Sequence, residues 1–237
     1  MIAGRIVDAP DAGNIASIMR SIGGRIMSDS TPIVYIVDDD VSVRESLDLM
    51  IRSSGLAVET YCSAEAFLAR ERSAAPSCLV LDMALPDLTG LELQQRLGNR
   101  ADMPIIFITG YGDVPMSVQA MKAGAIEFLT KPFKDDVLLV AIRAALERSR
   151  GAVRHDTDLR TLQSSYETLT TREREVMALV VAGLLNKQVG GQLGISEVTV
   201  KAHRGQVMRK LNAVSLPDLV RMAARLNLSP GLNQSSQ

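Results

Sequence analysis

Three aspartates, a threonine and a lysine stand at the ends of short apolar segments in the first part of the chain. Two aspartates follow residues 33–37, one follows residues 78–81, the threonine follows residues 105–108, and the lysine comes shortly after residues 126–129. In chain order they are Asp38, Asp39, Asp82, Thr109 and Lys131. An aspartate carboxylate is a nucleophile toward phosphorus and forms an aspartyl phosphate. Such a transfer needs positive charge beside the phosphoryl oxygens.

Three carboxylates held close together repel one another unless a cation neutralises them. Oxygen ligands without His or Cys favour a hard ion such as Mg²⁺. We therefore expect Mg²⁺ at these carboxylates, with Asp82 as the nucleophile because it stands alone on the middle strand. Lys131 would add positive charge, and the Thr109 hydroxyl would add a hydrogen bond. Taken singly, an aspartate after a strand is more simply a turn residue or a helix cap, the role expected of Asp40.

The segments that must bring these residues together alternate between strand and helix patterns. Apolar runs at residues 33–37, 57–61, 78–81, 105–108 and 126–129 are separated by stretches with helical spacing. Near-continuous apolar strands between helices indicate a parallel sheet covered on both faces. Five such units suit a flavodoxin-like α/β domain with strand order 2-1-3-4-5, in which ligands bind at the carboxyl ends of the strands. All five side chains would then meet at one edge.

Composition and charge narrow the function classes. The 237 residues allow one large domain or two small ones. Residues 31–135 carry 9 basic and 15 acidic side chains, whereas residues 169–237 carry 9 basic and 4 acidic ones, which points to nucleic acid as a partner of the second part. Two cysteines exclude a disulfide scaffold or a cysteine-built zinc cluster. No P-loop, glycine-rich dinucleotide turn or Ser/His/Asp order supports NTP, NAD or acyl chemistry. Without a membrane span or secretory signal, we expect a cytoplasmic protein that does not associate with membranes.

Residues 169–228 show only helical patterns. Thr170 and Glu173 have capping-box spacing at the start of the first helix. A second helix is expected over residues 186–193, ending at Gly194, and a third, capped by Ser196, reaches about residue 211. A fourth opens at Ser215 and ends near residue 226. A short helix, a glycine turn and a capped basic helix are typical of a helix-turn-helix DNA-binding unit.

The third of these helices has two distinct faces on a helical wheel. Its buried stripe comprises Val200, Val207 and Leu211. Its opposite face comprises Val198, Ala202 and Arg209, flanked by Lys201 and Gly205. Val198 and Ala202 suit a thymine methyl group and Lys201 suits guanine, whereas Arg209 and Lys210 suit phosphates. The simpler alternative is a basic helix that is merely solvated.

Four motifs within residues 33–150 strongly resemble those of two-component receiver domains. They are Val37-Asp38-Asp39-Asp40, Leu81-Asp82-Met83-Ala84-Leu85-Pro86-Asp87, Ile108-Thr109-Gly110-Tyr111-Gly112-Asp113 and Lys131-Pro132-Phe133. Two further stretches, Gly112-Asp113-Val114-Pro115-Met116 and Ala120-Met121-Lys122-Ala123-Gly124-Ala125, are similar to the FixJ-like subgroup. The resemblance implies that Asp82 accepts a phosphoryl group from the phosphohistidine of a sensor kinase, and that Lys131-Pro132 is a cis peptide. The other implied site residues are Asp38, Asp39 and the backbone carbonyl of Ala84 as Mg²⁺ ligands, Thr109 and Lys131 as phosphoryl-binding groups, and Thr109 with Phe128 as the switch pair.

The basic segment in turn resembles the LuxR/NarL-type DNA-binding domain over residues 169–226. The matching stretches are Leu169-Thr170-Thr171-Arg172-Glu173-Arg174-Glu175-Val176, Gly183-Leu184-Leu185-Asn186-Lys187-Gln188 and Leu193-Gly194-Ile195-Ser196-Glu197-Val198-Thr199-Val200-Lys201-Ala202-His203. The expected DNA contacts are Lys187, Val198, Thr199, Lys201, Ala202, Gly205 and Arg209. One departure is Gly190-Gly191 inside the second helix, where relatives usually have Ala first. Each glycine costs about 1 kcal/mol in a helix interior, so this helix should be frayed or unusually close to its neighbour.

These observations predict a transcriptional response regulator. The expected parts are a flexible extension at 1–30, a receiver domain at 31–150, a partly helical linker at 151–168, a DNA-binding domain at 169–228 and a disordered tail at 229–237. Gly151 is expected to break the helix before the linker. Phosphorylation would turn a monomer into a homodimer that binds paired half-sites on double-stranded promoter DNA, with RNA polymerase as a further candidate partner.

Two alternatives stay open at this point. The first is a Mg²⁺-dependent phosphatase with an aspartate nucleophile, although such enzymes usually carry Asp-x-Asp, and here Met83 and Ala84 follow Asp82. As a response regulator, by contrast, the chain would catalyse only its own phosphotransfer and dephosphorylation. The second alternative is a constitutive DNA-binding protein whose receiver serves only for dimerisation.

Overall fold

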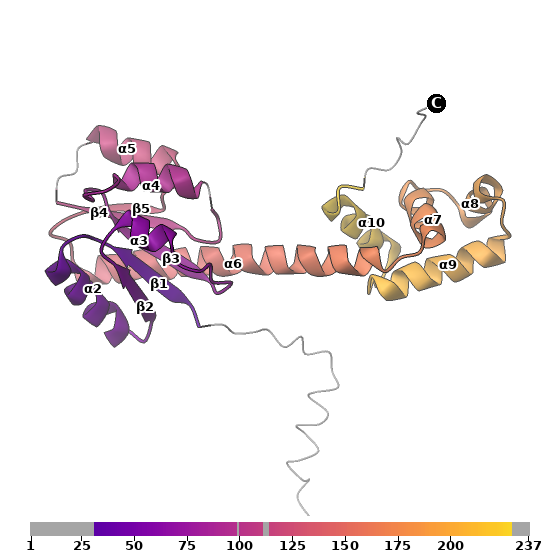
Figure 1. Ribbon diagram of the computed structural model, residues 1–237. Helices are drawn as coiled ribbons and strands as arrows, with labels where there is room; N and C mark the ends of the chain where they lie inside the picture. The colour runs from indigo at the N-terminus through magenta and orange to yellow at the C-terminus, as the bar shows by residue number, and fades with distance from the viewer. Residues whose placement is uncertain (1–30, 99, 111–113, 229–237) are drawn as a thin grey trace, which may run out of the picture. The chain divides into compact units, whose positions relative to one another are not determined.

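The computed structural model describes residues 31–98, 100–110 and 114–228 (Figure 1). The extension predicted at residues 1–30 and the tail predicted at residues 229–237 lie outside these ranges. The described chain consists of a five-stranded α/β domain, a long helix and a group of shorter helices. Within these ranges, no helix combines the length and the apolar character needed to cross a membrane.

Five parallel strands form the sheet of the α/β domain, in the order β2-β1-β3-β4-β5. They are β1 (Ile33–Val37), β2 (Ala57–Tyr61), β3 (Ser77–Asp82), β4 (Ile105–Thr109) and β5 (Glu127–Thr130). All six residues of the central strand β3 are buried, as expected for a strand covered on both faces. The predicted flavodoxin-like order is therefore confirmed.

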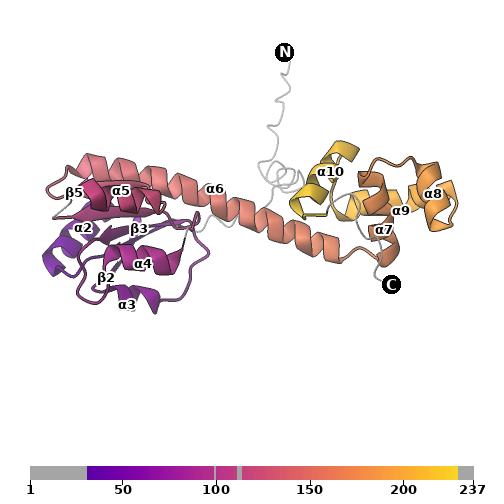
Figure 2. The same ribbon diagram turned by 90° about the horizontal axis from the view of Figure 1, so that it is seen from above.

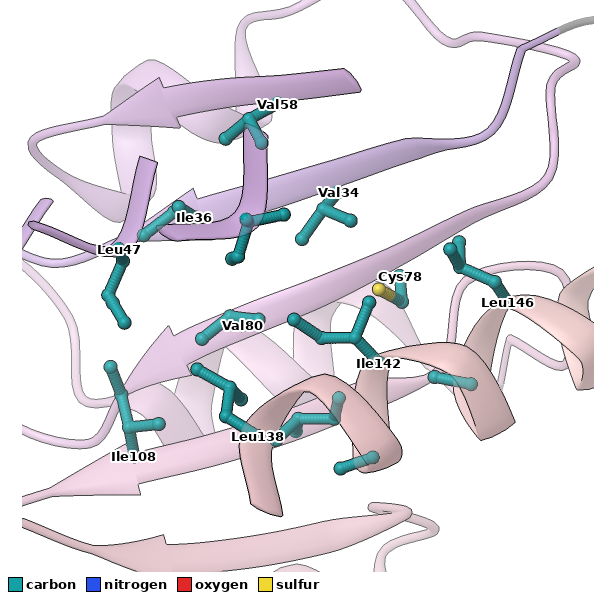
Figure 3. Close-up of a cluster of buried hydrophobic side chains, with 14 residues drawn as sticks. Val34, Ile36, Leu47, Val58, Cys78, Val80, Ile108, Leu138, Ile142 and Leu146 are labelled. Atoms are coloured by element: carbon teal, nitrogen blue, oxygen red, sulfur yellow. The ribbon is translucent and has the colours of Figure 1, made fainter. Parts of the chain in front are cut away.

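Side chains of the strands alternate between two apolar layers, because successive residues of a strand point to opposite faces. The helices of this domain are α2 (Val41–Ser53), α3 (Ala64–Leu68), α4 (Gly90–Leu97), α5 (Val114–Lys122) and the first part of α6 (Asp135–Glu167). On one face, Val34, Ile36 and Val80 pack with Leu47 of α2 and Leu138 of α6 (Figure 3). The opposite face packs against α3, α4 and α5 through side chains that include Phe67, Leu93 and Ala120.

Helix α2 begins where the sequence predicts. The carboxylate of Asp40 accepts a hydrogen bond from the Ser42 amide at 2.8 Å, so Asp40 is the cap of this helix. Asp40 is thereby committed to a structural role, which leaves Asp38 and Asp39 as the acidic groups at the end of β1.

Helix α6 is a single helix of 33 residues, and the break predicted at Gly151 is wrong (Figure 1 and Figure 2). Gly151 lies inside the helix and is exposed, with nothing within 4 Å of the place a Cβ would occupy. One glycine costs about 1 kcal/mol in a helix interior, which the helical residues on both sides outweigh. Ser149 is fully buried, and its hydroxyl accepts a hydrogen bond from the Ser77 amide at 2.8 Å. Leu162, further along the same helix, belongs to the core of the C-terminal helices.

The C-terminal helices are α7 (Thr171–Val181), α8 (Asn186–Leu193), α9 (Glu197–Lys210) and α10 (Leu216–Arg225). Their bounds agree with the predicted helices, and the capping box of Thr170 and Glu173 is present. Gly194 ends α8 in the left-handed conformation at φ +66°, which an L side chain rarely adopts. Val200, Val207 and Leu211 of the predicted stripe are buried in the shared apolar core.

Candidate functional site

Polar side chains at the ends of β1, β3 and β5 meet at the carboxyl edge of the sheet. Strands β1 and β3 are paired neighbours, so Asp38 and Asp82 leave the sheet side by side. Lys131 follows β5, where its amide donates to the carbonyl of Thr109 at 2.7 Å. The Nζ atom of Lys131 lies 2.8 Å from Oδ2 of Asp38 and 2.8 Å from Oδ2 of Asp82. One ammonium therefore bridges two carboxylates that are 44 positions apart in the chain.

The carboxyl edge that carries Asp38, Asp39, Asp82 and Lys131 is here called the rim. Burial determines the electrostatics of these side chains. The Asp38 side chain is fully buried and the Asp82 residue is 7% exposed. Burial raises the pKa of the Asp38 carboxyl above its usual range, against the opposing effect of the hydrogen bond from Lys131. Burial also works to lower the pKa of Lys131, but its hydrogen bonds to Asp38 and Asp82 outweigh this effect and raise that pKa. Lys131 is therefore held as a cation at the rim.

The rim has the composition of a site for a hard divalent cation. Asp38, Asp39 and Asp82 each offer a carboxylate oxygen, and these atoms lie within 4.8 Å of one another. Three carboxylates against the single ammonium of Lys131 leave a local charge of about −2 when all four are ionised. An all-oxygen donor set with that charge fits Mg²⁺. Ala84, whose carbonyl was predicted as a further ligand, is tied to the rim because its amide donates to Oδ1 of Asp82 at 3.1 Å.

The two predicted switch residues lie on adjacent strands. Thr109 is buried at the end of β4, where it pairs in register with Thr130 of β5. Phe128 of β5 is half-buried, and its ring centroid lies 6.3 Å from that of Phe107. The Lys131-Pro132 peptide is cis, as predicted.

Three further residues support the rim, and their roles were not predicted from the sequence. Arg44 donates to the carbonyl of Asp38 at 2.6 Å. A Cβ on Gly90 would lie 2.7 Å from the carbonyl oxygen of Asp82, so only glycine lets α4 approach this closely. Asp87 accepts hydrogen bonds from the first amides of α3. The capping-box spacing that begins at Thr89 marks in the sequence where the loop after β3 ends. The contacts of Asp87 with residues 22 or more positions away have no such local signal.

Most of the residues predicted to contact DNA are exposed. Val198 is 76% exposed, and Lys187, Lys201, Ala202, Gly205 and Arg209 are exposed as well. Lys201 forms an ion pair with Glu197 at 3.0 Å. Thr199 is half-buried, and its amide donates to the Ser196 hydroxyl at 3.1 Å, so its backbone belongs to the cap of α9.

Lys210 differs from the other basic residues of α9. Its Nζ atom lies 2.7 Å from Oε2 of Glu173 and 3.0 Å from the carbonyl oxygen of Thr168. This ammonium serves an internal ion pair, and the expected contact of Lys210 with a DNA phosphate stays a prediction. The pair joins the end of α9 to the start of α7.

Helix α8 approaches the following turn very closely at Gly190. A Cβ on Gly190 would lie 2.7 Å from the carbonyl oxygen of Ile195, whereas one on Gly191 would meet nothing within 4 Å. The Ile195 amide donates to the Gly190 carbonyl at 3.0 Å. Of the two outcomes predicted for this glycine pair, the structure shows the close approach.

Comparison with known proteins finds relatives of both the α/β domain and the C-terminal helical domain. The family of response regulator receiver domains matches residues 34–143, and the luxR family of bacterial regulatory proteins matches residues 167–223. Nodulation protein W of Bradyrhizobium diazoefficiens is 47% identical over 219 residues, which are 92% of this chain and 96% of that protein. Transcriptional regulatory protein FixJ of Rhizobium meliloti is 46% identical over 205 residues, which are 86% of this chain and all of that protein. The solved structure of response regulator StyR is similar with a TM-score of 0.75 and 47% identity, over 83% of this chain and all of that one.

A receiver fold followed by a LuxR-type helical domain defines the class of two-component response regulators that regulate transcription. Within that class, this chain belongs to the FixJ-like response regulators. Membership implies a histidine kinase upstream and DNA as the target.

Proposed function

We propose that Asp82 is the phosphoryl acceptor of this regulator. The observation that carries the proposal is the Lys131 ammonium, which lies 2.8 Å from carboxylate oxygens of both Asp38 and Asp82. Asp82 has one oxygen held by the Ala84 amide and the other by Lys131, so its carboxylate is oriented at the open edge of the sheet. A group placed there can attack a phosphoryl donor that approaches from solvent.

The transfer breaks the N–P bond of a phosphohistidine and forms an O–P bond to Asp82, and the kinase histidine leaves as imidazole. The Lys131 ammonium, now in contact with Asp82, would contact an oxygen of the phosphoryl group once that group is on Asp82. Its positive charge would offset the negative charge of the transferred group. When bound, Mg²⁺ supplies further positive charge to the phosphoryl oxygens. It would be held by Asp38, Asp39 and Asp82 together with the Ala84 carbonyl. The only reactions of the protein itself would be this phosphotransfer and the later hydrolysis.

The phosphoryl group would then bias a two-state receiver domain. The Thr109 hydroxyl is expected to hydrogen-bond a phosphoryl oxygen, and the neighbouring ring of Phe128 to turn inward. Val114, Val118 and Met121 of α5 are 75%, 45% and 45% exposed, so a second copy would remove apolar surface from water by covering them. These three side chains are the candidate contact surface for the dimer that we expect to form on phosphorylation.

A dimer would present two copies of α9 to paired half-sites of double-stranded promoter DNA. The exposed Val198, Ala202 and Gly205 leave room for base edges, whereas Lys187 and Arg209 suit phosphates. RNA polymerase is a further candidate partner of the DNA-bound dimer. The protein would encounter its kinase and its promoter in the cytoplasm.

The experiment compares the wild type with Asp82→Asn and with the control Asp136→Asn, which changes an exposed aspartate at the start of α6. Each protein is treated with acetyl phosphate and Mg²⁺ and analysed by intact mass, light scattering and promoter binding. The wild type and the control should gain one phosphate, dimerise and bind the promoter more tightly. Asp82→Asn should do none of these. Phosphate on Asp82→Asn, or a phosphorylated wild type with unchanged size and DNA affinity, would contradict the proposal.

A further inference from the structure

The segment of residues 83–89, here called the acceptor loop, connects Asp82 to α4. Its base is closed by two backbone hydrogen bonds, from the Met83 amide to the Ile108 carbonyl at 3.1 Å and from the Gly90 amide to the Met83 carbonyl at 2.9 Å. Gly90 cannot carry a side chain here without displacing the Asp82 backbone. The base of the loop is therefore fixed to the sheet, and its tip needs a separate anchor.

Asp87 provides an anchor at the tip. Its Oδ2 accepts a hydrogen bond from the Glu65 amide at 2.8 Å, and its Oδ1 lies 3.4 Å from the Ala64 amide. The first amides of a helix lack partners within the helix, so a carboxylate from another segment is well placed to accept from them. Burial works to raise the pKa of Asp87, but backbone hydrogen bonds, first that from Glu65 and then those from its own amide, Ala64 and Leu88, together outweigh it and hold that pKa below its usual range. The contact thus favours the ionised carboxylate.

We propose that Asp87 is a positioning residue for the Mg²⁺ site, because it fixes the acceptor loop that carries the Ala84 carbonyl. Two hydrogen-bonded contacts hold Ala84 in place. Its own amide donates a hydrogen bond to Asp82, and Asp87, three residues later, accepts hydrogen bonds from the start of α3. Without the contact between Asp87 and α3, the tip of the acceptor loop is more mobile, and the Ala84 carbonyl no longer has one fixed position. The three carboxylates of the rim keep their positions. This inference rests on the proposed function.

The chain offers a matched control in Ser63. The Ser63 hydroxyl accepts from the Ala66 amide at 3.1 Å and so caps the same helix from within its own segment. Ser63→Ala and Asp87→Ala both remove a cap from α3. Only Asp87→Ala releases the loop, so any effect common to both variants belongs to α3 alone.

The test measures Mg²⁺ affinity directly, by calorimetric titration of the full-length chain with MgCl₂ and no phosphoryl donor. Loss of a residue that orients metal ligands typically weakens metal binding about tenfold or more, and we expect that from Asp87→Ala. Ser63→Ala should stay within about twofold of the wild type. Should Asp87→Ala not fold, Asp87→Asn keeps one acceptor oxygen and should weaken Mg²⁺ by a smaller factor.

Equal affinities of Asp87→Ala (or Asp87→Asn) and wild type would overturn the inference, and so would an equal loss in Ser63→Ala. In either case the proposed phosphoryl acceptor would stand, because the wild type would still bind Mg²⁺ and gain phosphate on Asp82. A wild type that binds no Mg²⁺ would refute both the inference and the proposed metal site. Hydrogen exchange adds a second readout, since amides of residues 83–89 should exchange faster in Asp87→Ala but not in Ser63→Ala.

Discussion

Replacing either glycine of the adjacent pair in α8 with alanine gives two variants that should differ in their free energy of unfolding, because only one of the two positions has room for a Cβ. Gly191 is exposed, and a Cβ there meets nothing within 4 Å, so Gly191→Ala gains helix propensity alone. That gain is about 1 kcal/mol in the free energy of unfolding. Gly190→Ala has the same gain but places its Cβ 2.7 Å from the Ile195 carbonyl oxygen.

The obstacle at Gly190 is a backbone atom, which cannot swing aside as the end of a side chain would. Ile195 is also held by the bond from its own amide to the Gly190 carbonyl. Overpacking of this kind costs about 1–3 kcal/mol, so Gly190→Ala should be neutral or destabilising. Because the propensity gain is common to both variants, their difference reports the strain alone.

Hydrogen exchange of amides in α8 and α9 measures the stability of this domain without interference from the sheet. Exchange should slow in Gly191→Ala and should be unchanged or faster in Gly190→Ala. Equal protection in the two variants would refute the close approach as the reason for glycine.

Three further predictions concern the C-terminal domain. Leu185 precedes α8 with an exposed side chain that cannot cap it, so Leu185→Thr should raise the free energy of unfolding by about 1 kcal/mol in urea denaturation. Hydrogen bonds from Lys210 and then from the Thr170 amide hold the pKa of Glu173 below its usual range, so the stability that this carboxylate contributes is intact above pH of about 4.3 and is lost as pH falls through the lower folded-state pKa. Thermal unfolding at a series of pH values should show this loss in the wild type and a flatter profile in Glu173→Gln. In binding assays, Lys201→Ala should relax base preference, whereas Arg209→Ala should weaken binding to all sequences alike and reduce its salt dependence.

The rim could be predicted from the sequence because strand ends are a strong constraint. Once the apolar runs are taken as parallel strands, Asp38, Asp82 and Lys131 must leave the sheet at the same edge, whatever the details of packing. The helix bounds of the C-terminal domain were predictable for a similar reason. Caps such as Thr170 and Ser196 act on neighbours three residues away, so the signal is local.

The errors and omissions concern effects that are not local. Gly151 was expected to end a helix on propensity alone, but its neighbours on both sides are helical and outweigh a single glycine. The contact of Lys210 with Glu173, 37 positions away, was not predicted either. Asp87 belongs to a receiver-like motif, but its contact with α3 was not predicted because the amides that donate to it lie in another segment. Each case depends on which segments pack together, which a single sequence does not specify.

The span of the Lys131 bridge bears on how the protein is made. The ammonium and its farther carboxylate partner are 93 positions apart, and the lysine follows the last strand of the sheet to be synthesised. A nascent chain that ends before this residue has the two carboxylates but no ammonium beside them, and burying them in that state is unfavourable. The proposed acceptor site is therefore incomplete in every nascent chain that ends before Lys131, whereas residues 132–237 can still be under synthesis when its last side chain is added.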